Sequence, residues 1–368
     1  MNRVLVTGGA GFIGSNYIRH ALKAHPDWEI WNFDKLTYAG NLANLKDLKK
    51  NPHYHFLKGD IADAQAVAEA MKAGIDMIIN FAAESHVDRS IQGSQEFLMT
   101  GVIGVQTLLD AAKEHQVQLF YQISTDEVYG DVEHGQFSKE TDMLHPSSPY
   151  SAAKAAGDLL VLAYARTHQV PVIISRCTNN YGPYQYPEKM LPLFVTNVLQ
   201  QKKVPVYGDG QQIRDWLHVD DHCRGIDVVL DKGVRGEIYN IGANHVPEHP
   251  NLEVTKIILD ELGVDESMIE HVADRPGHDR RYAVDTSKIE ALGWKSEVPF
   301  EEGIRQTVQW YKDHPEWWLP ILSGEFQKYY QEQYSSPSLP TLSLRQAGPK
   351  PSSPRARASE PRAGRRGE

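Results

Sequence analysis

Two adjacent acids, Asp126 and Glu127, directly follow Ser124 and Thr125 at the end of an apolar run that begins at Leu119. The run predicts a buried strand, so both acids are expected in the loop at its carboxyl end, where open parallel sheets build active sites. An unpaired carboxylate is costly in a protein core, whereas in a loop the pair offers a proton donor beside a proton acceptor. An acidic loop without a function is the competing interpretation. Taken alone the two residues favour it, because charged loops are common.

Tyr150 and Lys154 form a second reactive pair, four positions apart. Ser148 followed by Pro149 predicts the start of a helix, and residues at this spacing share one face of a helix. Tyrosine has an ordinary pKa of about 10 and is a poor base at neutral pH. A neighbouring ammonium group would have to lower that pKa before Tyr150 could accept a proton. Tyr–Lys pairs also occur without function on exposed helices, so the catalytic interpretation needs support from elsewhere in the chain.

A glycine-rich turn near the start of the chain supplies that support. Strand-forming residues lead into Gly8, Gly11 and Gly14, and an apolar helix pattern follows. This order is typical of a site that holds the pyrophosphate of a dinucleotide at a helix N-terminus. Asp34 ends the next predicted strand, where a carboxylate would meet the adenosine ribose hydroxyls and repel a 2′-phosphate. The pattern favours NAD over NADP, although Lys35 weakens that preference, and an oxidised nicotinamide would help to lower the pKa of Tyr150.

Strand and helix patterns alternate along the first half of the chain. Strands are expected at residues 4–7, 30–33, 54–57, 77–81, 119–123 and 172–175, and later helices at residues 254–262 and 300–311. Alternation of this kind predicts an α/β fold with a Rossmann-like, doubly wound, mainly parallel sheet. We expect a Rossmann domain over residues 1–178, to which a segment around 215–242 returns. A smaller α/β substrate lobe is expected over most of residues 179–334.

The composition is that of an ordinary globular protein, with 368 residues, 41% of them hydrophobic. No apolar run approaches the ~20 residues needed to cross a bilayer, and the N-terminus reads as a strand and not as a signal peptide. Cys177 and Cys223 are too few for a disulfide framework and are expected as core thiols. The net charge of −10 argues against general nucleic-acid binding. We therefore expect a cytoplasmic protein with no membrane or nucleic-acid partner.

The C-terminal residues 335–368 differ from the rest of the chain. They contain seven Lys or Arg and two Asp or Glu, so they carry +5 while residues 1–334 carry −15. Rich in Pro, Ser and Arg, with little to bury, they are expected to be disordered. A nucleic-acid or membrane arm is one interpretation, and a read-through or otherwise appended extension is the favoured one.

Several motifs resemble a known family. Residues 7–14 (TGGAGFIG) with Tyr150-x-x-x-Lys154 resemble the extended short-chain dehydrogenase/reductases, a group with many activities. Residues 34–41, 82–90, 124–130, 176–183 and 277–282 are together similar to the dTDP-glucose 4,6-dehydratase family, and the similarity extends to about Tyr334. The sequence departs from the family at Gly101, where Asn is usual, at Pro276, where Leu is common, and at residues 245–250, which look inserted. The first departure bears on cofactor binding at Thr100, and the others on substrate preference.

The resemblance implies NAD as a cofactor, a nucleotide-sugar substrate such as dTDP-glucose, and a homodimer. The dimer is expected to pair helices around residues 94–114 and 150–167 into a four-helix interface. It implies cofactor contacts from Gly8, Gly11, Phe12, Ile13, Gly14, Asp34, Lys35, Thr37, Asp60, Ile61, Ala82, Ala83, Ser85, Thr100, Tyr150, Lys154 and Asn180. It implies substrate contacts from Ser85, Thr125, Asn179, Glu188, Lys189, Leu191, Pro205, Tyr207, Arg214, Asn251, Arg275 and His278.

Some residues keep two interpretations. Asp60 could cap a helix or touch adenine. Glu84 and His86 could be catalytic, but beside Asp88 and Arg89 a structural ion network is favoured. Arg214, Arg275 and Arg280 or Arg281 are candidates for a clamp on the pyrophosphate, and the resemblance favours Arg214 and Arg275. The pair His218 and His222 superficially suggests a metal site, yet no further ligands accompany it, so no metal is expected.

The family chemistry would use five catalytic residues: Thr125, Asp126, Glu127, Tyr150 and Lys154. Because the C5 proton of a hexose is not acidic until C4 is a ketone, oxidation must come first. Tyr150, assisted by Lys154 and Thr125, would take the O4 proton as hydride leaves C4 for NAD. Glu127 would then remove the C5 proton and Asp126 would protonate the departing C6 hydroxyl, before hydride returns to C6. The expected activity is that of a lyase in deoxysugar biosynthesis.

Three alternatives remain at this point. A nucleotide-sugar 4-epimerase would need Tyr150, Lys154 and NAD but has no task for an acid–base pair. A protein that binds NAD only as a sensor or scaffold would leave all four reactive residues without a role. A dehydratase for another nucleotide-glucose, such as UDP-glucose, stays open because the sequence does not fix thymidine against uridine.

Overall fold

The structure is a computed structural model and describes residues 2–323, 326, 330–331 and 333. The predicted tail at residues 335–368 lies outside these residues. No helix in the described part of the chain is both long enough and apolar enough to cross a membrane.

The centre of the molecule is a seven-stranded sheet in the order β11-β6-β5-β4-β1-β2-β3. Each neighbouring pair runs parallel. The strands are β1 (Arg3–Thr7), β2 (Glu29–Asp34), β3 (Tyr54–Lys58), β4 (Met77–Asn80), β5 (Leu119–Thr125), β6 (Val172–Cys177) and β11 (Ile238–Ile241). The predicted Rossmann-like, doubly wound fold is confirmed. Since the strand order reverses between β1 and β4, the crevice at their carboxyl ends is the expected place for a ligand.

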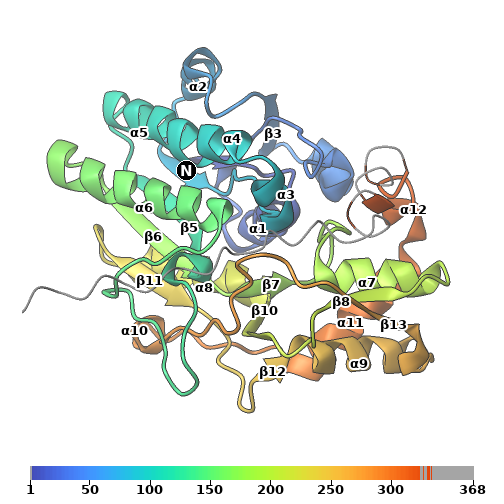
Figure 1. Cartoon of the computed structure of the whole chain (residues 1–368). Coiled ribbons are helices and arrows are strands. Elements are labelled where there is room, and N and C mark those ends of the chain that lie inside the picture. Colours follow the sequence, from blue (N-terminus) through green and yellow to red (C-terminus); the bar gives the residue numbers. More distant parts are fainter. Residues whose placement is uncertain (1, 324–325, 327–329, 332, 334–368) are drawn as a thin grey trace, which may run out of the picture.

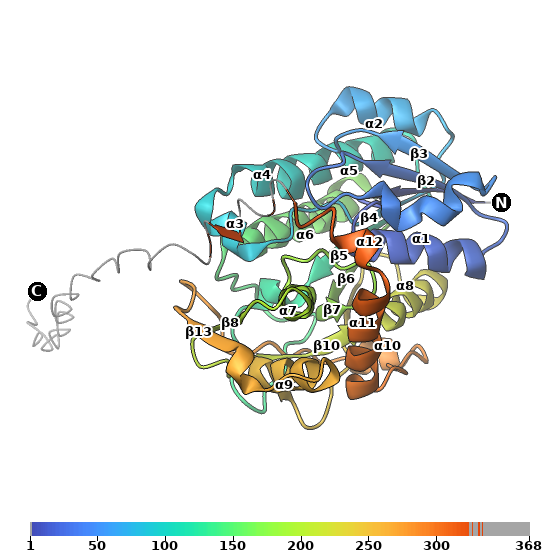
Figure 2. The ribbon, with the colours of Figure 1, turned by 90° about the vertical axis from the view of Figure 1, so that its right-hand side faces the viewer.

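Helices cover both faces of the sheet, as Figures 1 and 2 show. One face carries α1 (Phe12–Ala24), α8 (Val219–Lys232) and the short α10 (Ser287–Glu290), and the other carries α2 (Ala64–Met71), α5 (Val105–Glu114) and α6 (Pro149–His168). Successive side chains of a strand point to opposite faces. Val4 and Tyr121 accordingly pack in the core under α1 and α8, whereas Leu5 and Phe120 pack under α2, α5 and α6.

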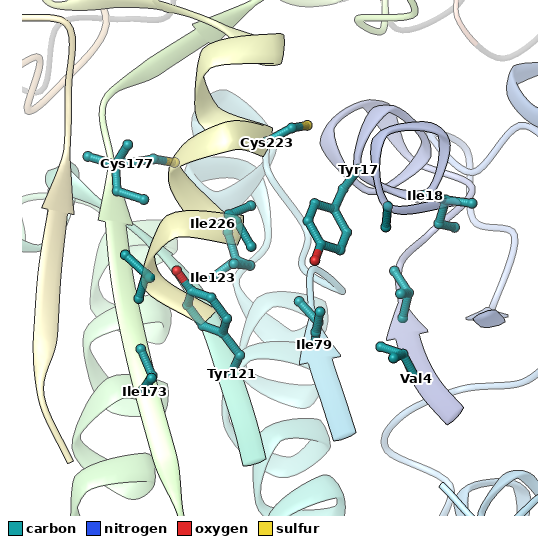
Figure 3. Packing of buried hydrophobic residues seen from close by; sticks show 14 of the residues in the cluster. Val4, Tyr17, Ile18, Ile79, Tyr121, Ile123, Ile173, Cys177, Cys223 and Ile226 are labelled. Carbon is teal, nitrogen blue, oxygen red and sulfur yellow. The ribbon is translucent and has the colours of Figure 1, made fainter. Parts of the chain in front are cut away.

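Figure 3 shows the first of these cores at close range. Tyr17 and Ile18 of α1 and Cys223 and Ile226 of α8 pack over strand residues such as Ile79. Cys177 and Cys223 are buried free thiols, as expected. The alternation of buried side chains on both faces explains why the strand sequences are almost continuously hydrophobic.

A second hydrophobic core lies outside the sheet, below it in Figure 1. Its helices are α7 (Met190–Leu199), α9 (Asn251–Glu261), α11 (Phe300–Asp313) and α12 (Pro315–Trp318). Three two-stranded pairs accompany them: β7 (Asn179–Tyr181) with β10 (Trp216–His218), β8 (Val204–Tyr207) with β13 (Ile269–Val272), and β9 (Ile213–Arg214) with β12 (His249–Pro250). We propose that the boundary between the two lobes follows Thr178. After it the chain builds the second core but returns to the sheet through α8 and β11.

The single helix expected over residues 94–114 is divided. The structure has α3 (Val87–Gln92), α4 (Gln95–Leu98), a π-helical segment η2 (Met99–Gly104) and then α5. A Cβ added at Gly104 would come within 2.5 Å of the Ile61 side chain, and one at Gly101 within 3.3 Å of Ala153 in α6. Small residues in η2 therefore allow close packing on both sides. The remaining short helical turns are η1 (Leu42–Lys50), η3 (Asp126–Tyr129) and η4 (Glu266–Met268).

Candidate active site

The two acids lie where β5 ends, as expected. Thr125 is the last residue of β5, and Asp126 and Glu127 open the single 3₁₀ turn η3. The Thr125 hydroxyl caps this turn by accepting from the Glu127 N–H at 3.3 Å and donates to Asp126 Oδ1 at 3.1 Å. One threonine thus fixes both acids relative to the strand.

The surroundings of the two acids differ in charge. Burial, and then the nearby Glu127, raise the pKa of Asp126 to about 8. Its Oδ2 is buried without a hydrogen-bond partner among the described residues. Burial also raises the pKa of Glu127, but Arg275, Lys189 and Arg214 oppose that shift. Asp126 is therefore suited to donate a proton at neutral pH, and Glu127 is the member of the pair with more cations opposing the rise in its pKa.

Tyr150 and Lys154 lie in the first turns of α6, whose start is as predicted. Ser148 and Ser151 form a capping box, and Pro149 is the first helical residue. Lys154 Nζ donates to the Ile123 carbonyl of β5 at 2.7 Å. This bond holds the lysine beside the strand that carries the two acids.

That Lys154, helped by an oxidised nicotinamide, lowers the pKa of Tyr150 stays a prediction. Burial and then Glu127 hold the pKa of Tyr150 well above its ordinary value. Burial lowers the pKa of Lys154, and Asp158 opposes that change. The reason is that both side chains are desolvated, which disfavours their charged forms. The hydrogen bond with Thr125 opposes the rise in the pKa of Tyr150, and the positive charge of an oxidised nicotinamide would lower it further.

A cavity of about 270 Å³ runs along the carboxyl ends of the sheet. All seventeen residues assigned to the cofactor line it. The sequence analysis missed further lining residues, among them Gly40, Glu84, Cys177, Gln185 and Tyr186. Gly40 and Cys177 lie within the motifs that carry the family resemblance, which was the available signal.

The glycine turn fits a dinucleotide because side chains have no room there. Gly8 has φ +65°, and a Cβ on it would lie 2.7 Å from the backbone of Ala82. A Cβ on Gly14 would lie 2.5 Å from the Gly8 carbonyl oxygen. No side chain therefore separates the backbone of this turn from the cavity at the N-terminal end of α1. A bound pyrophosphate requires such a close approach to the backbone.

Asp34 and Asp60 line the cavity where the adenosine of NAD is expected. Asp34 accepts from the Ala10 N–H at 2.9 Å and the Leu36 N–H at 2.7 Å, so it also braces the glycine turn. Asp60 accepts from the Ala62 N–H at 2.9 Å and pairs with Lys35 at 2.9 Å. The cap interpretation of Asp60 is wrong, since Asp63 caps α2. The contacts of Asp34 and Asp60 with NAD stay predictions.

A second cavity of about 150 Å³ adjoins the first, and Glu127, Asn179 and Lys189 line both. It contains most residues assigned to the substrate: Glu188, Pro205, Tyr207, Arg214, Asn251, Arg275 and His278. Ser85 and Thr125 line the cofactor cavity instead. Leu191 lines neither cavity, because its side chain is buried in the second core. It could contribute only through its backbone N–H in the first turn of α7.

The two chosen arginines are fixed by different partners. Arg214 donates to the carbonyls of Ile213 at 2.7 Å and Asp279 at 2.9 Å. Arg275 lies 3.4 Å from Asp88. Since the fixed guanidinium groups line one cavity, they can present donors to phosphate oxygens there.

The alternative arginines lie elsewhere. Arg280 pairs with Asp209 at 2.8 Å on the surface, and neither residue lines a cavity. Arg281 is buried against Glu248 and donates to the Glu133 carbonyl at 2.7 Å. Its role is to hold the loop after η3.

The structure also gives the positions of the histidines and acids for which two interpretations were open. His222 Nδ1 lies 2.8 Å from Asn180 Oδ1, and burial lowers the pKa of His222 to about 3. No group of three or more metal-binding side chains occurs in the part of the chain that the structure describes. Glu84 lines the cofactor cavity and His86 the second cavity. Arg89 belongs to an ion pair, with Glu188 at 3.2 Å.

Comparison with known proteins agrees with this arrangement. A family model described as GDP-mannose 4,6 dehydratase matches residues 5–307. The chain belongs to this family. Within the GDP-mannose 4,6 dehydratase family its similarity is to the dTDP-glucose 4,6-dehydratases, as the motifs predict. It is 50% identical over 328 residues to the dTDP-glucose 4,6-dehydratase of Streptomyces niveus, and the match covers 88% of this chain and 96% of the relative.

Solved structures of family members give the same result. The dTDP-glucose 4,6-dehydratase of Streptomyces venezuelae, solved with NAD bound, is 51% identical with a TM-score of 0.84, and the match covers 87% of this chain and 99% of that one. The UDP-glucose 4-epimerase of Thermus thermophilus, also solved with NAD, is 29% identical with a TM-score of 0.78, and the match covers 85% and 99%. The fold is common to both activities, but the sequence is much nearer the dehydratase.

Proposed function

We propose that this protein is a dTDP-glucose 4,6-dehydratase, a hydro-lyase that converts dTDP-glucose to dTDP-4-keto-6-deoxyglucose. The observation that carries the proposal is the place of Asp126 and Glu127. They follow β5 directly, Asp126 lines the cofactor cavity, and Glu127 lines both cavities. A hexose held at that junction would have the two acids beside it and NAD next to it.

The cavity residues fit NAD, through the bare glycine turn, Asp34 and the Tyr150–Lys154 pair. When bound, NAD supplies a hydride acceptor for C4 of the hexose and later a hydride donor for C6. Tyr150 accepts the O4 proton in the first step. Lys154 is held in place by its hydrogen bond to the Ile123 carbonyl. Lys154 and the Thr125 hydroxyl assist Tyr150.

The elimination follows from the difference between the two acids. Once C4 is a ketone, the C5 proton is acidic and Glu127 removes it as the base; Arg275, Lys189 and Arg214 oppose the rise that burial gives to the pKa of Glu127. Asp126 holds a proton at neutral pH because its pKa is about 8, and it transfers that proton to the leaving C6 hydroxyl. A proton transfer by a positioned group contributes about 10² to 10⁴ in rate.

The phosphates and the base would lie in the second cavity. Arg214 and Arg275 line that cavity and would bind the pyrophosphate. Thymidine is the expected base because relatives named as dTDP-glucose 4,6-dehydratases reach 50% and 51% identity with this chain. A 4-epimerase is not favoured, since the epimerase structure is 29% identical and that reaction has no use for an acid–base pair.

The test is to incubate the purified protein with dTDP-glucose and, separately, with UDP-glucose, and to follow the 4-keto-6-deoxy product. We expect product from dTDP-glucose without consumption of NAD, and much less from UDP-glucose. Epimerisation at C4 without loss of water would refute the proposal. Tyr150→Phe serves as the inactive control.

Two finer parts of the proposal concern the whole molecule. We propose a homodimer, because Leu98, Met99, Ile103 and Leu159 are large hydrophobic residues 40–58% exposed on neighbouring segments.

We also propose the cytoplasm as the compartment, since both cysteines are free thiols and reduced thiols are usual there. Fractionation of cells that produce the protein would check the compartment.

A further inference from the structure

Two segments distant in sequence line the cofactor cavity from opposite lobes. Thr37, Ala39 and Gly40 line it from the loop after β2, and Gln185 and Tyr186 from the loop before α7. Tyr38 belongs to the first loop, yet it lines neither of the two cavities described above. Its side chain points instead to the second loop, where it meets a buried acid.

That acid, Glu188, has a side chain with 0% exposure. The Tyr38 hydroxyl donates to Glu188 Oε1 at 2.8 Å, and Arg89 Nε donates to Oε2 at 3.2 Å. The Arg89 guanidinium lies 4.0 Å from the centre of the Tyr38 ring. Tyr38 also packs edge-on against Tyr186, with ring centres 5.4 Å apart. Tyr38, Glu188 and Arg89 therefore contact one another in a closed triangle between the two loops.

We propose that Tyr38, Glu188 and Arg89 form a clasp that holds the two loops together over the cofactor cavity and slows the release of NAD. The idea rests on the proposed function, because a cofactor that is restored in every turnover has no need to leave. Tyr38 is a positioning residue in this clasp, since it touches neither cavity.

Breaking only some of the contacts in the clasp is energetically unfavourable. A carboxylate with no exposure must keep its hydrogen-bond partners, since a buried acceptor left unpaired loses its hydration without compensation. Burial and then Glu188 raise the pKa of Tyr38, so its hydroxyl stays protonated and remains a donor. Separating the two loops breaks the Tyr38–Glu188 hydrogen bond and the edge-on contact of Tyr38 with Tyr186 together.

The experiment compares Tyr38→Phe with the wild type and with Tyr54→Phe as a matched control. Tyr54 also loses only a hydroxyl bonded to a side chain, Asn32 at 3.0 Å, and lines neither cavity. NAD release is measured by diluting the NAD-loaded protein into an enzyme that consumes free NAD. We expect Tyr38→Phe to release NAD about tenfold faster, the factor that loss of one hydrogen bond to a charged group implies.

Three further readings separate this role from a loss of folding. With NAD added in excess, turnover by Tyr38→Phe should return to within about twofold of the wild type. Tyr54→Phe should release NAD at the wild-type rate. Glu188→Gln should also release NAD faster; because Glu188 lines the substrate cavity, only its NAD release is scored.

Release from Tyr38→Phe at the wild-type rate would overturn the clasp, as would equally fast release from Tyr54→Phe or a loss of turnover that excess NAD does not restore. Failure of the proposed function has a different signature. The wild type would then retain no NAD and form no 4-keto product, which would refute the function and the clasp together.

Discussion

At the scale of single residues, the burial that makes Asp126 a proton donor also makes this residue unfavourable for the stability of the folded state. The neighbouring Thr125 binds one oxygen of Asp126, while the other has no partner among the described residues. Such an unpaired group is common at functional sites, where stability is exchanged for reactivity. The two predictions at this scale separate chemistry from stability.

The first concerns the order of steps. Glu127→Gln and Asp126→Asn keep the shape of the site but remove the base and the acid of the elimination. Both should still oxidise C4, so the absorbance of reduced nicotinamide should build up on the protein while product formation falls ~10²-fold or more. Tyr150→Phe should show no such absorbance. Near-normal turnover in both acid variants would mean that the acids are incidental.

The second concerns pH and stability. In the folded protein the pKa of Asp126 is raised to about 8, whereas an unfolded aspartate titrates at about 4. Between these values the folded state holds a proton that the unfolded state has lost, so this group lowers stability progressively as pH rises through that window. Asp126→Asn should therefore raise Tm relative to the wild type by more at pH ~8 than at pH ~5. Thermal melts at both values check this, and an equal difference at both would contradict it.

Residue types and spacing were enough to predict the reactive groups, because the chemistry of a side chain follows from its type. They could not give the pKa of Tyr150, which depends on burial contributed by segments far away in the sequence. Leu191 shows the same limit: the family resemblance implied a substrate contact, but the packing of α7 buries its side chain in the second core.

At the scale of elements, α6 carries Tyr150 and Lys154 and is anchored by a buried ion pair. Asp158 of α6 accepts from Arg176 Nε of β6 at 2.9 Å, and the two side chains are 0% and 2% exposed. Arg176 also donates to the Tyr129 hydroxyl at 2.9 Å, just beyond the two acids. The pair thus joins the helix, the strand and the catalytic turn.

Removing one partner of this pair should be severe. Asp158→Asn leaves a buried guanidinium without its counter-charge and should cost about 3–5 kcal/mol of unfolding free energy. Tyr164→Phe on the same helix removes only a partly exposed bond to Asp110 and should cost no more than about 1 kcal/mol. Denaturant titration of both variants is the measurement. Equal, small losses would show that the buried pair does not anchor α6.

The strands and the start of α6 could be predicted because their signals are local: apolar runs, a Ser-Pro cap, and a carboxylate where a strand ends. The π-helical segment η2 could not. It depends on how closely Gly101 approaches Ala153 of α6 and Gly104 approaches Ile61, and these contacts join residues far apart in the chain. The Gly101 departure from the family pattern thus coincides with close helix packing.

At the scale of the whole molecule, the proposed dimer rests on the large hydrophobic residues exposed on α4, η2 and α6. Leu98 is 48% exposed, Met99 40% and Leu159 58%. Exposed residues that are grouped in this way are typical of an interface, whereas scattered ones need no explanation. A second copy of the chain, paired through equivalent helices about a two-fold axis, would bury them.

The dimer is tested by placing charges at the expected interface. A variant with Leu98→Glu and Leu159→Glu would have to bury four carboxylates at a two-fold interface, which is unfavourable without cationic partners. Sedimentation at micromolar concentration should show a dimer for the wild type and a monomer for this variant. Val234→Glu is the control, because Val234 is 61% exposed and far from these helices in sequence; it should stay dimeric. A monomeric wild type, or a dimer that survives both substitutions, would place the interface elsewhere or remove it. The catalytic turn η3 follows β5, and Tyr150 and Lys154 of α6 line the cofactor cavity and not the exposed helix surface, so we expect the monomer to keep measurable turnover while melting at a lower temperature.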